Sequence, residues 1–450
     1  MRHETADFPS EEGRNIPYVV LSTSTSSQTL PRDPNKLRVW IQGSTHGDEP
    51  ASEQSILAFL GSLDANHSRA LSLLQKLDIL ILPRYNPDGV AYFQRRFATN
   101  FDPARDHIKL RSEQTRHTKS LFNAFAPHVA VDMHEFSAKA RYAERYVRVL
   151  DGQFAVGKNL NIHPDIRRLS EDIFAHSIGA ALEAVGLRCA PYSTGRRNAT
   201  DDGRLSFSEA GGEGCIARNA WGLTQAVAIL CETRGIGIAD QHFARRTFTG
   251  LTMLDAVVST AAQRADEVWS KVHLARQAFI DSREDIVVTD APKIIKCSWP
   301  FVDLHGGRLV EVPSIVKSST PLSPKLTRAR PRAYLIPKAW SELIPRLLVN
   351  GIDVTTLEQA FRDEVEVLQI TSVEFENEYH EGAVRAKVKT KLLRKVIQLP
   401  VGSFQVSTVQ KMAALAFIAL EPEGVDSFAT MNIVPLVPGD DYPIFRVLWK

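Results

Sequence analysis

The hydrophobic positions in the first half of the chain form short continuous runs, separated by stretches with the periodicity of a helix. Continuous apolar runs of this kind are typical of strands buried on both faces of a mostly parallel sheet. They are Leu37–Gln42, Leu77–Leu82, Val129–Met133 and Val227–Cys231. The stretches between them place apolar residues on one helix face. They are Ala51–Leu63, Ser112–Phe125 and Arg167–Val185. Strands that alternate with helices predict an α/β fold, a mostly parallel mixed sheet flanked by helices.

The pattern changes beyond residue 285. Before that point, Leu251–Ser282 has the pattern of one or two helices that close the α/β domain. After it come short, partly alternating runs rich in β-branched residues, which favour strands. They are Asp285–Thr289, Arg308–Val316, Arg332–Ile336, Val365–Val373, Ala383–Val396 and Phe428–Val434. The sequence therefore predicts two domains, an α/β domain over residues 1–285 and a β-rich domain over residues 290–450.

Composition and charge exclude several classes of protein. The chain has 450 residues, of which 44% are hydrophobic and 24% are charged, and these are ordinary values for a globular protein. Lys and Arg number 54 and Asp and Glu number 52, so the net charge is only +2. A strong bulk charge would favour a nucleic acid or a membrane surface as the partner. Neither partner is predicted here.

Cysteines and apolar stretches narrow the choice further. The 4 cysteines include no Cys-x-x-Cys pair, so neither a disulfide scaffold nor a cysteine-based zinc site is predicted. The longest apolar run, Met412–Leu420, is about half of the roughly 20 residues that a membrane helix needs. Residues Met1–Asn15 show no apolar signal-peptide core. We therefore expect a cytoplasmic protein, or a secreted one if the N-terminus is incomplete.

The first candidate for chemistry is the segment Gly43–Pro50, directly after the first predicted strand. His46 and Glu49 are three positions apart on a turn that Gly47 loosens. An imidazole nitrogen and a carboxylate at this spacing can both reach one zinc ion at about 2.0–2.2 Å. A surface turn with an acid that caps the following helix fits the segment equally well.

Two more predicted strands run directly into histidine and acidic residues. His134 lies in the segment Asp132–Glu135, and Glu232 follows Val227–Cys231. A side chain just past the carboxyl end of a buried strand points into the crevice where α/β proteins bind ligands. An acid there is either a general base in a low-dielectric cleft or a structural partner of a neighbour such as Arg234.

Arginines follow the strand Leu77–Leu82 and the turn Pro83–Gly89. They are Arg95 and Arg96, and then Arg105 within Phe101–Asp106. A planar guanidinium can hold a carboxylate through two hydrogen bonds, although any single arginine can also be a solvated surface charge. Together the loops at the strand ends supply three zinc ligands, a carboxylate base and cationic anchors.

In their order and their residues, these motifs resemble those of the M14 zinc carboxypeptidase family. That family carries a His-x-x-Glu after an early strand, an Asn-Pro-Asp-Gly turn, an Asp-x-Asn-Arg stretch, a later His after a strand, and a Glu at the end of a late strand. The resemblance covers roughly residues 36 to 248 and is closest to a bacterial and fungal branch. The matching segments are His46–Ala51, Asn86–Gly89, Asp102–Arg105, Asp132–Phe136 and Glu232–Gly237.

The resemblance implies a zinc centre with defined roles. His46, Glu49 and His134 would bind one zinc ion, and Glu232 would act as general base and general acid. Asp102 would orient the first zinc histidine and so fix its tautomer.

The resemblance also implies how the substrate is held, and here the sequence departs from the family. Arg105 would bind the terminal carboxylate of the substrate, and Arg96, or failing that Arg95, would polarise the scissile carbonyl. The family's asparagine beside the carboxylate-binding arginine is Ala104 in this chain. One hydrogen bond to the substrate terminus is therefore expected to be missing.

A second departure concerns a tyrosine. The family's substrate-binding tyrosine has no counterpart, because no tyrosine lies between Tyr192 and Glu232. Arg218 and Asn219 are candidate substrate contacts in its place. Both departures leave the zinc chemistry intact and affect only the choice of substrate.

These expectations describe a zinc-dependent metallocarboxypeptidase with one zinc ion. Its substrate would be a peptide or an acylated amino acid with a free carboxylate. An N-acyl amino-acid deacylase, of the aspartoacylase and succinylglutamate desuccinylase kind, resembles the same superfamily and would use the same zinc ligands. A pseudo-enzyme, whose β-rich domain binds a partner while the cleft is idle, is the alternative outside catalysis.

Overall fold

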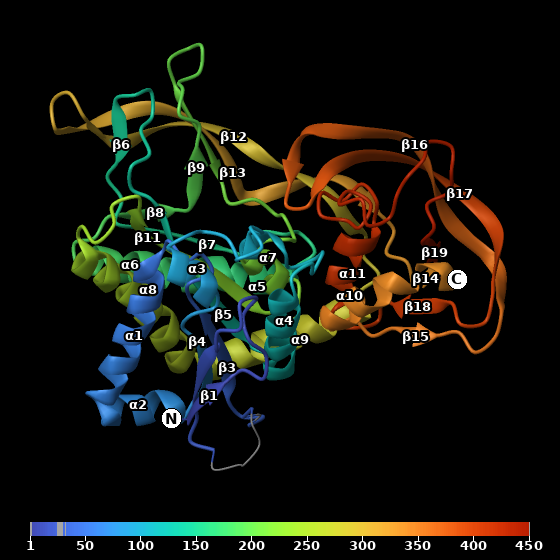
Figure 1. Ribbon diagram of the computed structural model, residues 1–450, viewed down its shortest axis with the longest axis horizontal. Coiled ribbons are helices and arrows are strands. Elements are labelled where there is room, and N and C mark those ends of the chain that lie inside the picture. The colour runs from blue at the N-terminus through green and yellow to red at the C-terminus, as the bar shows by residue number, and fades with distance from the viewer. Residues whose placement is uncertain (1, 25–29, 32, 450) are drawn as a thin grey trace.

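The structure is a computed structural model that describes residues 2–24, 30–31 and 33–449. Its centre is an eight-stranded sheet with the order β1-β2-β4-β3-β5-β11-β7-β8 (Figure 1). The pairs β4–β3, β3–β5, β5–β11 and β7–β8 are parallel, and the others are antiparallel. The strands are β1 (Arg2–Thr5), β2 (Pro17–Leu21), β3 (Leu37–Gln42), β4 (Leu77–Leu82), β5 (Val129–Ser137), β7 (Gly152–Val156), β8 (Cys189–Pro191) and β11 (Val227–Ile236). The predicted fold, a mostly parallel mixed sheet flanked by helices, is confirmed.

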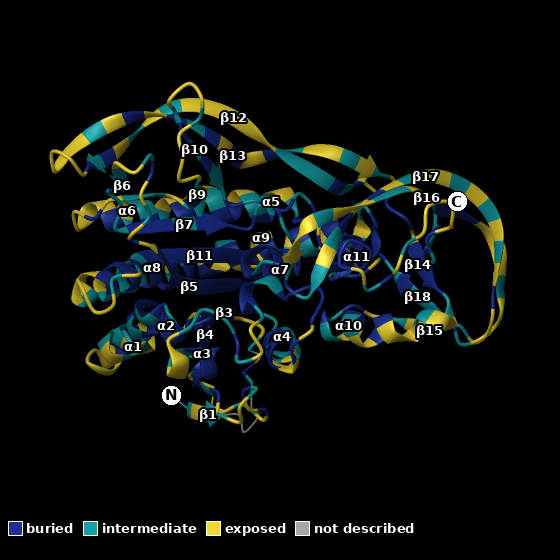
Figure 2. Ribbon diagram, turned by 45° about the horizontal axis from the view of Figure 1, so that its top comes forward, coloured by how far each residue is buried: buried dark blue, intermediate teal, exposed yellow. Residues whose placement is uncertain are grey.

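The apolar runs in the sequence coincide with the central strands. β3 and β4 have the predicted limits, and β4 is buried at every position. The strands β5 and β11 are dark along most of their length in the burial view (Figure 2). Both continue past their apolar runs, so His134 and Glu232 lie inside strands and not in the loops beyond them. The predicted strands Val129–Met133 and Val227–Cys231 are too short, because the polar residues of the site continue each strand beyond its apolar run.

Helices cover the two faces of the sheet unequally. The larger core packs α1, α2, α6, α8 and α9 against one face, and the smaller core packs α4 and α7 against the other. The helical segments are α1 (Pro50–Asp64), α2 (His67–Leu74), α3 (Pro87–Tyr92), η1 (Pro103–Arg105), α4 (Glu113–Phe125), α5 (Pro164–Arg168), η2 (Leu169–Ala175), α6 (His176–Ala184), α7 (Ala217–Gly222), α8 (Phe243–Gln263) and α9 (Ala265–Asp281). The predicted helix over Arg167–Val185 is interrupted by η2, a π-helical segment.

The chain beyond α9 is mostly antiparallel sheet. A long hairpin, β12 (Ile286–Asp303) and β13 (Arg308–Arg328), extends above the first half of the molecule in Figure 1. There it pairs with β6 (Tyr146–Arg148) and β10 (Leu205–Glu209), and β10 also pairs with β9 (Ser193–Gly195). The two halves of the chain therefore share one five-stranded sheet. The division at residues 285–290 stays a prediction.

A six-stranded sheet fills the C-terminal part, in the order β15-β18-β14-β19-β16-β17. Its elements are β14 (Ala333–Ile336), η3 (Lys338–Leu343), α10 (Ile344–Val349), β15 (Thr355–Thr356), β16 (Phe361–His380), β17 (Ala383–Leu399), β18 (Phe404–Ser407), α11 (Ala413–Leu420) and β19 (Phe445–Val447). The expectation of a β-rich C-terminal part is confirmed. The predicted strand over Phe428–Val434 is wrong, because this buried segment forms turns in which the Ser427 hydroxyl accepts from the amide of Thr430.

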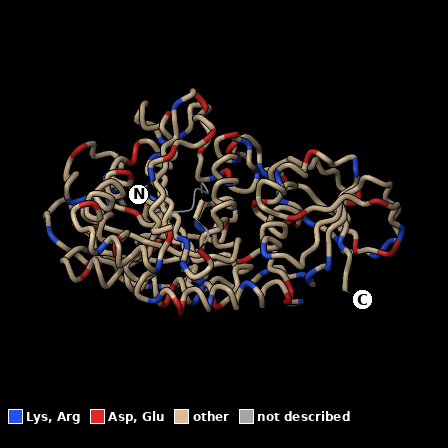
Figure 3. Tube along the Cα trace, turned by 90° about the horizontal axis from the view of Figure 1, so that it is seen from below, with Lys and Arg blue, Asp and Glu red and all other residues tan. Residues whose placement is uncertain are grey.

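Charges of both signs are interspersed over the whole trace (Figure 3), as a net charge of +2 leads one to expect. Among the helices of the described residues, none combines the length and the apolar character needed to span a bilayer.

Candidate active site

Strand register brings the predicted base and one predicted zinc ligand together. In the parallel pairing of β5 with β11, Glu232 lies opposite His134. Neighbouring strands are about 4.8 Å apart, and side chains at paired positions point to the same side of the sheet. The two side chains are therefore neighbours on one face, at the carboxyl ends of parallel strands.

The other two ligands come from the loop between β3 and α1. This loop packs against the Asn-Pro-Asp-Gly turn so closely that a Cβ atom on Gly47 would lie 1.9 Å from the carbonyl carbon of Gly89. Only glycine fits there, and the amide of Gly47 donates to the carbonyl of Gln94 at 3.0 Å. Pro50 then begins α1, which places His46 and Glu49 at the edge of the sheet beside β5.

The three predicted ligands form one compact cluster. Their ligand atoms all lie within 4.8 Å of one another, and all three side chains are buried. The Glu49 carboxylate lies 2.7 Å from His46 Nδ1 and 2.8 Å from His134 Nδ1. The two Nδ1 atoms are 3.1 Å apart. Two nitrogens that share a tetrahedral zinc ion at about 2.0–2.1 Å lie about 3.3 Å apart, so the donor set fits zinc.

The outer partners of the histidines support this assignment. Asp102 Oδ1 lies 3.2 Å from His46 Nε2, and Asp132 Oδ2 lies 2.9 Å from His134 Nε2. Because a carboxylate only accepts, each Nε2 carries the proton, and each Nδ1 keeps a lone pair that can bind a metal, with Arg95 Nη1 also 3.2 Å from His46 Nδ1. Without a metal ion, the two Nδ1 atoms, 3.1 Å apart, and the Glu49 carboxylate would converge on one point with no shared partner there. A divalent cation supplies this partner.

The electrostatics of the cluster favour positive charge. Burial opposes ionisation of Glu49, but the two imidazoles hold its pKa well below the usual value. Burial likewise opposes the charged form of His134, yet the carboxylates of Asp132 and Glu49 raise its pKa well above the usual range. Three buried carboxylates, those of Glu49, Asp102 and Asp132, thus lie against the two histidines. This concentration of negative charge favours a bound cation.

Glu232 is a carboxylate beside the zinc ligands that makes no polar side-chain contact of its own in the described part of the chain. It has no hydrogen-bond or ion-pair partner among the residues that the structure describes, and it is 6% exposed. Burial, aided by Glu49 and opposed by His134, raises the pKa of Glu232 to about 7. The nearby Glu135 is engaged instead, since its carboxylate pairs with Arg246 at 2.6 Å and accepts from the amide of Ala51 at 2.6 Å.

The arginines separate into two groups. Arg95 and Arg105 line the cavity that holds the metal ligands, whereas Arg96 is not among its lining residues. Arg95 pairs with Asp102 at 2.9 Å and lies 3.6 Å from Glu49. Arg96 pairs instead with Glu381 at 2.6 Å. Of the two candidates, Arg95 therefore faces the cavity and Arg96 faces away from it, because successive side chains of this segment point in different directions.

The two candidates for additional substrate contact also differ. Arg218 lines the cavity, donates to the carbonyl of Gly211 at 2.9 Å, and leaves its Nε without a partner among the described atoms. Asn219 is not among the lining residues. Its side-chain amide donates to the carbonyls of Gly211 and Glu213 and accepts from the main-chain amide of Lys158, so it connects loops of the fold. Asn219 is thus removed from the candidate contacts.

The cavity is about 470 Å³ and contains residues that the sequence did not reveal. Tyr192, between β8 and β9, lines it beside Glu232, and burial raises the pKa of its hydroxyl above the usual range. Arg148 on β6 lines it as well and donates to Gln153 Oε1 at 2.6 Å. Neither residue stands in a motif, so only the fold reveals them.

Comparison with known proteins finds similarity to zinc carboxypeptidases. The family model for zinc carboxypeptidases matches residues 9–147. Carboxypeptidase 2 of Trichophyton tonsurans is 50% identical over 449 residues, which are 99% of this chain and 83% of that protein. Carboxypeptidase 2 of Trichophyton rubrum gives the same identity and coverage. A solved metallo-carboxypeptidase from Pseudomonas aeruginosa, in complex with (2-guanidinoethylmercapto)succinic acid, is 20% identical, with a TM-score of 0.43 over 59% of this chain and 64% of that chain.

The 50% identity to the Trichophyton carboxypeptidases extends over nearly the whole chain, including the C-terminal part that carries no recognised motif. The ligands His46, Glu49 and His134 stand together as a zinc site in the same molecule. The chain therefore belongs to the M14 zinc carboxypeptidase family.

Proposed function

We propose that this metallocarboxypeptidase removes the C-terminal residue of peptides that end in a free carboxylate, which Arg105 holds. The observation that carries the proposal is the state of the Arg105 guanidinium. It lines the cavity of the zinc ligands and Glu232 and makes one hydrogen bond, to the carbonyl of Ala104 at 3.1 Å. Within residues 2–24, 30–31 and 33–449 it has no carboxylate partner. A cation kept unpaired in a cavity is a ready partner for a substrate carboxylate.

The metal site and Glu232 supply the hydrolytic step. Zinc, when bound by His46, Glu49 and His134, supplies Lewis acidity and makes the attacking water more acidic. Glu232 accepts the proton of that water as the water attacks the carbonyl carbon, and then donates a proton to the leaving nitrogen. Its freedom from hydrogen bonds and its position opposite His134 support this role. The peptide bond breaks, and a new carboxylate and a free amine are formed.

Arg95 is the residue proposed to stabilise the oxyanion. Its guanidinium reaches the cavity beside His46 and is held by two contacts to Asp102, at 2.9 and 3.1 Å. A donor fixed in advance loses little freedom when charge develops on the carbonyl oxygen, and such a donor is worth about 3–4 kcal/mol. Asp102 thus orients both the zinc histidine and this arginine.

Tyr192 is proposed to take part in holding the substrate. Its ring comes from the loop after β8, and its hydroxyl has no hydrogen-bond partner among the described residues. Arg105 and Arg218 are both charged neighbours of the tyrosine. A phenol in this place can donate to a substrate carboxylate or amide, which would offset the absence of an asparagine at Ala104.

We expect Arg105→Gln to lower kcat/KM for a peptide substrate by about 10- to 100-fold, chiefly through KM. Glutamine keeps a donor but removes the charge, and a hydrogen bond to a charged group is worth about 1.5–3 kcal/mol. Steady-state kinetics on one peptide with a free C-terminus and on its C-terminal amide provide the measurement and its control. The wild-type protein should prefer the acid strongly, and the variant should treat the two substrates nearly alike. A variant that keeps the full preference would show that another residue holds the carboxylate.

The same assay distinguishes the deacylase alternative. Peptides of several lengths and N-acylated amino acids are offered to the wild-type protein at equal concentration. The proposal expects faster release of the C-terminal residue from the peptides, whereas faster hydrolysis of the short acyl amino acids would favour the deacylase.

A further inference from the structure

The C-terminal part of the chain reaches the active site through the tip of one hairpin. Strands β16 and β17 run side by side from the far end of the molecule back toward the α/β sheet (Figure 1), and their last pair is His380 with Ala383. The tip between them is Glu381 and Gly382, with φ of 47° and 96°. Two successive residues with positive φ are typical of the type I′ turn of a two-residue hairpin.

This tip is seated on the loop that carries the active-site arginines. The Glu381 carboxylate pairs with Arg96 Nη1 at 2.6 Å through one oxygen. Its other oxygen accepts from the main-chain amide of Asp102 at 2.7 Å. The Glu381 carbonyl accepts from Lys109 Nζ at 2.5 Å, and the Gly382 carbonyl accepts from Arg111 at 3.5 Å. Glu381 is 8% exposed, so its own carboxylate and carbonyl are largely shielded from water, whereas the bond between Arg111 and Gly382 is exposed.

The contact leads directly to the zinc site. Asp102, whose amide Glu381 holds, bonds His46 through one carboxylate oxygen and Arg95 through the other. Arg96, whose side chain Glu381 holds, is the direct chain neighbour of Arg95. Glu381 therefore holds the side chain of Arg96 and the backbone of Asp102, at the two ends of the segment beside a zinc ligand and the proposed oxyanion donor.

The positive φ of Glu381 at the hairpin tip indicates that a glutamate side chain is needed at this position. Positive φ is uncommon for residues other than glycine, and the first position of a type I′ turn prefers asparagine, aspartate or glycine. Gly382 has a φ of 96°, a conformation in which a residue with a side chain would be strained. A glutamate held in an unfavourable conformation, with its carboxylate fully bonded, points to a function for the carboxylate.

We propose that Glu381 is a positioning residue for the zinc peptidase reaction, and that the β16–β17 hairpin serves to place it. The proposal rests on the proposed function of the site. It acts through Asp102 and Arg96 and requires no contact between Glu381 and the substrate. It gives the C-terminal sheet a role in catalysis, as a support for the loop over residues 95–111.

The test replaces Glu381 with asparagine in the full-length, zinc-loaded protein. Asparagine suits the turn better than glutamate, so Tm should be unchanged or higher, yet its side chain is too short to reach both partners. We expect kcat/KM for a C-terminal peptide substrate to fall by about 10- to 100-fold, the range found when groups that orient metal ligands are removed. The dissociation constant for zinc, measured by competition with a chelator, should rise by about 10-fold or more.

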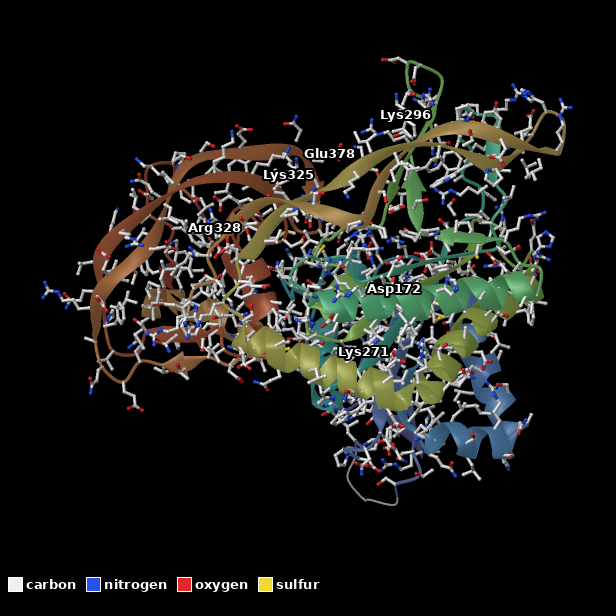
Figure 4. The ribbon with its side chains drawn as sticks, turned by 180° about the vertical axis from the view of Figure 1, so that it is seen from behind. Asp172, Lys271, Lys296, Lys325, Arg328 and Glu378 are labelled. Atoms are coloured by element: carbon white, nitrogen blue, oxygen red, sulfur yellow. The ribbon has the colours of Figure 1, made fainter. Side chains whose placement is uncertain are left out.

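Two further variants make the result specific. Glu381→Gln keeps the length and removes the charge, and it should lose most of the same activity. Glu378, labelled in Figure 4, lies on the same hairpin and is exposed, so Glu378→Gln should behave as the wild-type protein does. Values of kcat/KM and zinc affinity within about twofold of wild type for both Glu381 variants would overturn the proposal. A loss of activity in Glu381→Asn that merely follows a lower Tm would overturn it as well.

Failure of the proposed function would look different. If the wild-type protein released no C-terminal residue from any peptide, the peptidase assignment of the site would fail. The zinc dissociation constants of the Glu381 and Glu378 variants would still decide whether the hairpin tip positions the metal ligands.

Discussion

Replacing Glu232 with glutamine is expected to lower kcat by roughly 10²–10⁴-fold while zinc remains bound. Glutamine has nearly the same shape as glutamate but cannot accept the proton of the attacking water. Glu232 is buried opposite His134 and has no partner in the part of the chain that the structure describes. Its replacement by a neutral group therefore breaks no hydrogen bond or ion pair among the described residues, and the fold should be unaffected. Steady-state kinetics together with metal analysis of the same sample provide the measurement.

The control for this variant is the metal content, because loss of zinc would also abolish turnover. We expect one zinc ion per chain in Glu232→Gln, a Tm close to that of the wild-type protein and a KM of similar size. A variant that retains near-normal kcat would remove Glu232 from the mechanism. Glu135 would not be a substitute, since Arg246 and the first turn of α1 already hold its carboxylate.

Replacing His134 with alanine is expected to remove both the metal and the activity. Three buried ligands converge on one point, and the remaining pair, His46 and Glu49, cannot complete a four-coordinate site with only one open position. The bound metal also stabilises the fold, by about 4 kcal/mol when free zinc exceeds its dissociation constant a thousandfold. Zinc content, activity and thermal unfolding should therefore all change together in His134→Ala.

His163 provides the matched control for the loss of a histidine. Its ring accepts from the amide of Asp165 at 3.2 Å at the start of α5, away from the zinc ligands. The variant His163→Ala should keep one zinc ion and full activity, with a small loss of stability from the missing cap. Zinc bound at normal affinity in His134→Ala would mean that the ligand set is wrong.

The sequence alone indicated the sheet and the zinc ligands because buried parallel strands are apolar along their length and end at one edge of the sheet. The strands β3 and β4 are buried almost throughout, so apolar residues dominate both runs despite Arg38 and Asp78, and their limits could be read directly. His46 and Glu49 are close in sequence, and His134 and Glu232 each end an apolar run. Parallel strands bring such ends to one edge, which is why a pattern along the chain predicted a cluster in space.

The substrate-binding residues could be predicted only in part. Arg95 and Arg96 are adjacent, and no pattern in the sequence tells which of them faces the cavity. In the structure Arg95 lines the cavity, while Arg96 pairs with Glu381, which lies far away along the chain. Tyr192 was missed for a similar reason, since it enters the cavity from a short loop between β8 and β9 rather than from a strand end.

The C-terminal part shows the limits of pattern reading most clearly. Alternating apolar residues predicted its strands, but the pairing of β12 with β6 and of β13 with β10 joins residues that are distant in sequence. The partial alternation and β-branched residues of Phe428–Val434 predict a strand, yet this mostly buried segment forms turns that cover the core. Burial explains its composition, and its hydrogen bonds explain its shape.

One measurement tests the zinc centre directly: a crystal structure of the purified protein, with data collected on both sides of the zinc absorption edge. The account predicts a single anomalous peak within bonding distance of His46 Nδ1, His134 Nδ1 and the Glu49 carboxylate, with Glu232 beside it on the neighbouring strand. A map with no peak at this position, or with the zinc held by other residues, would contradict the account.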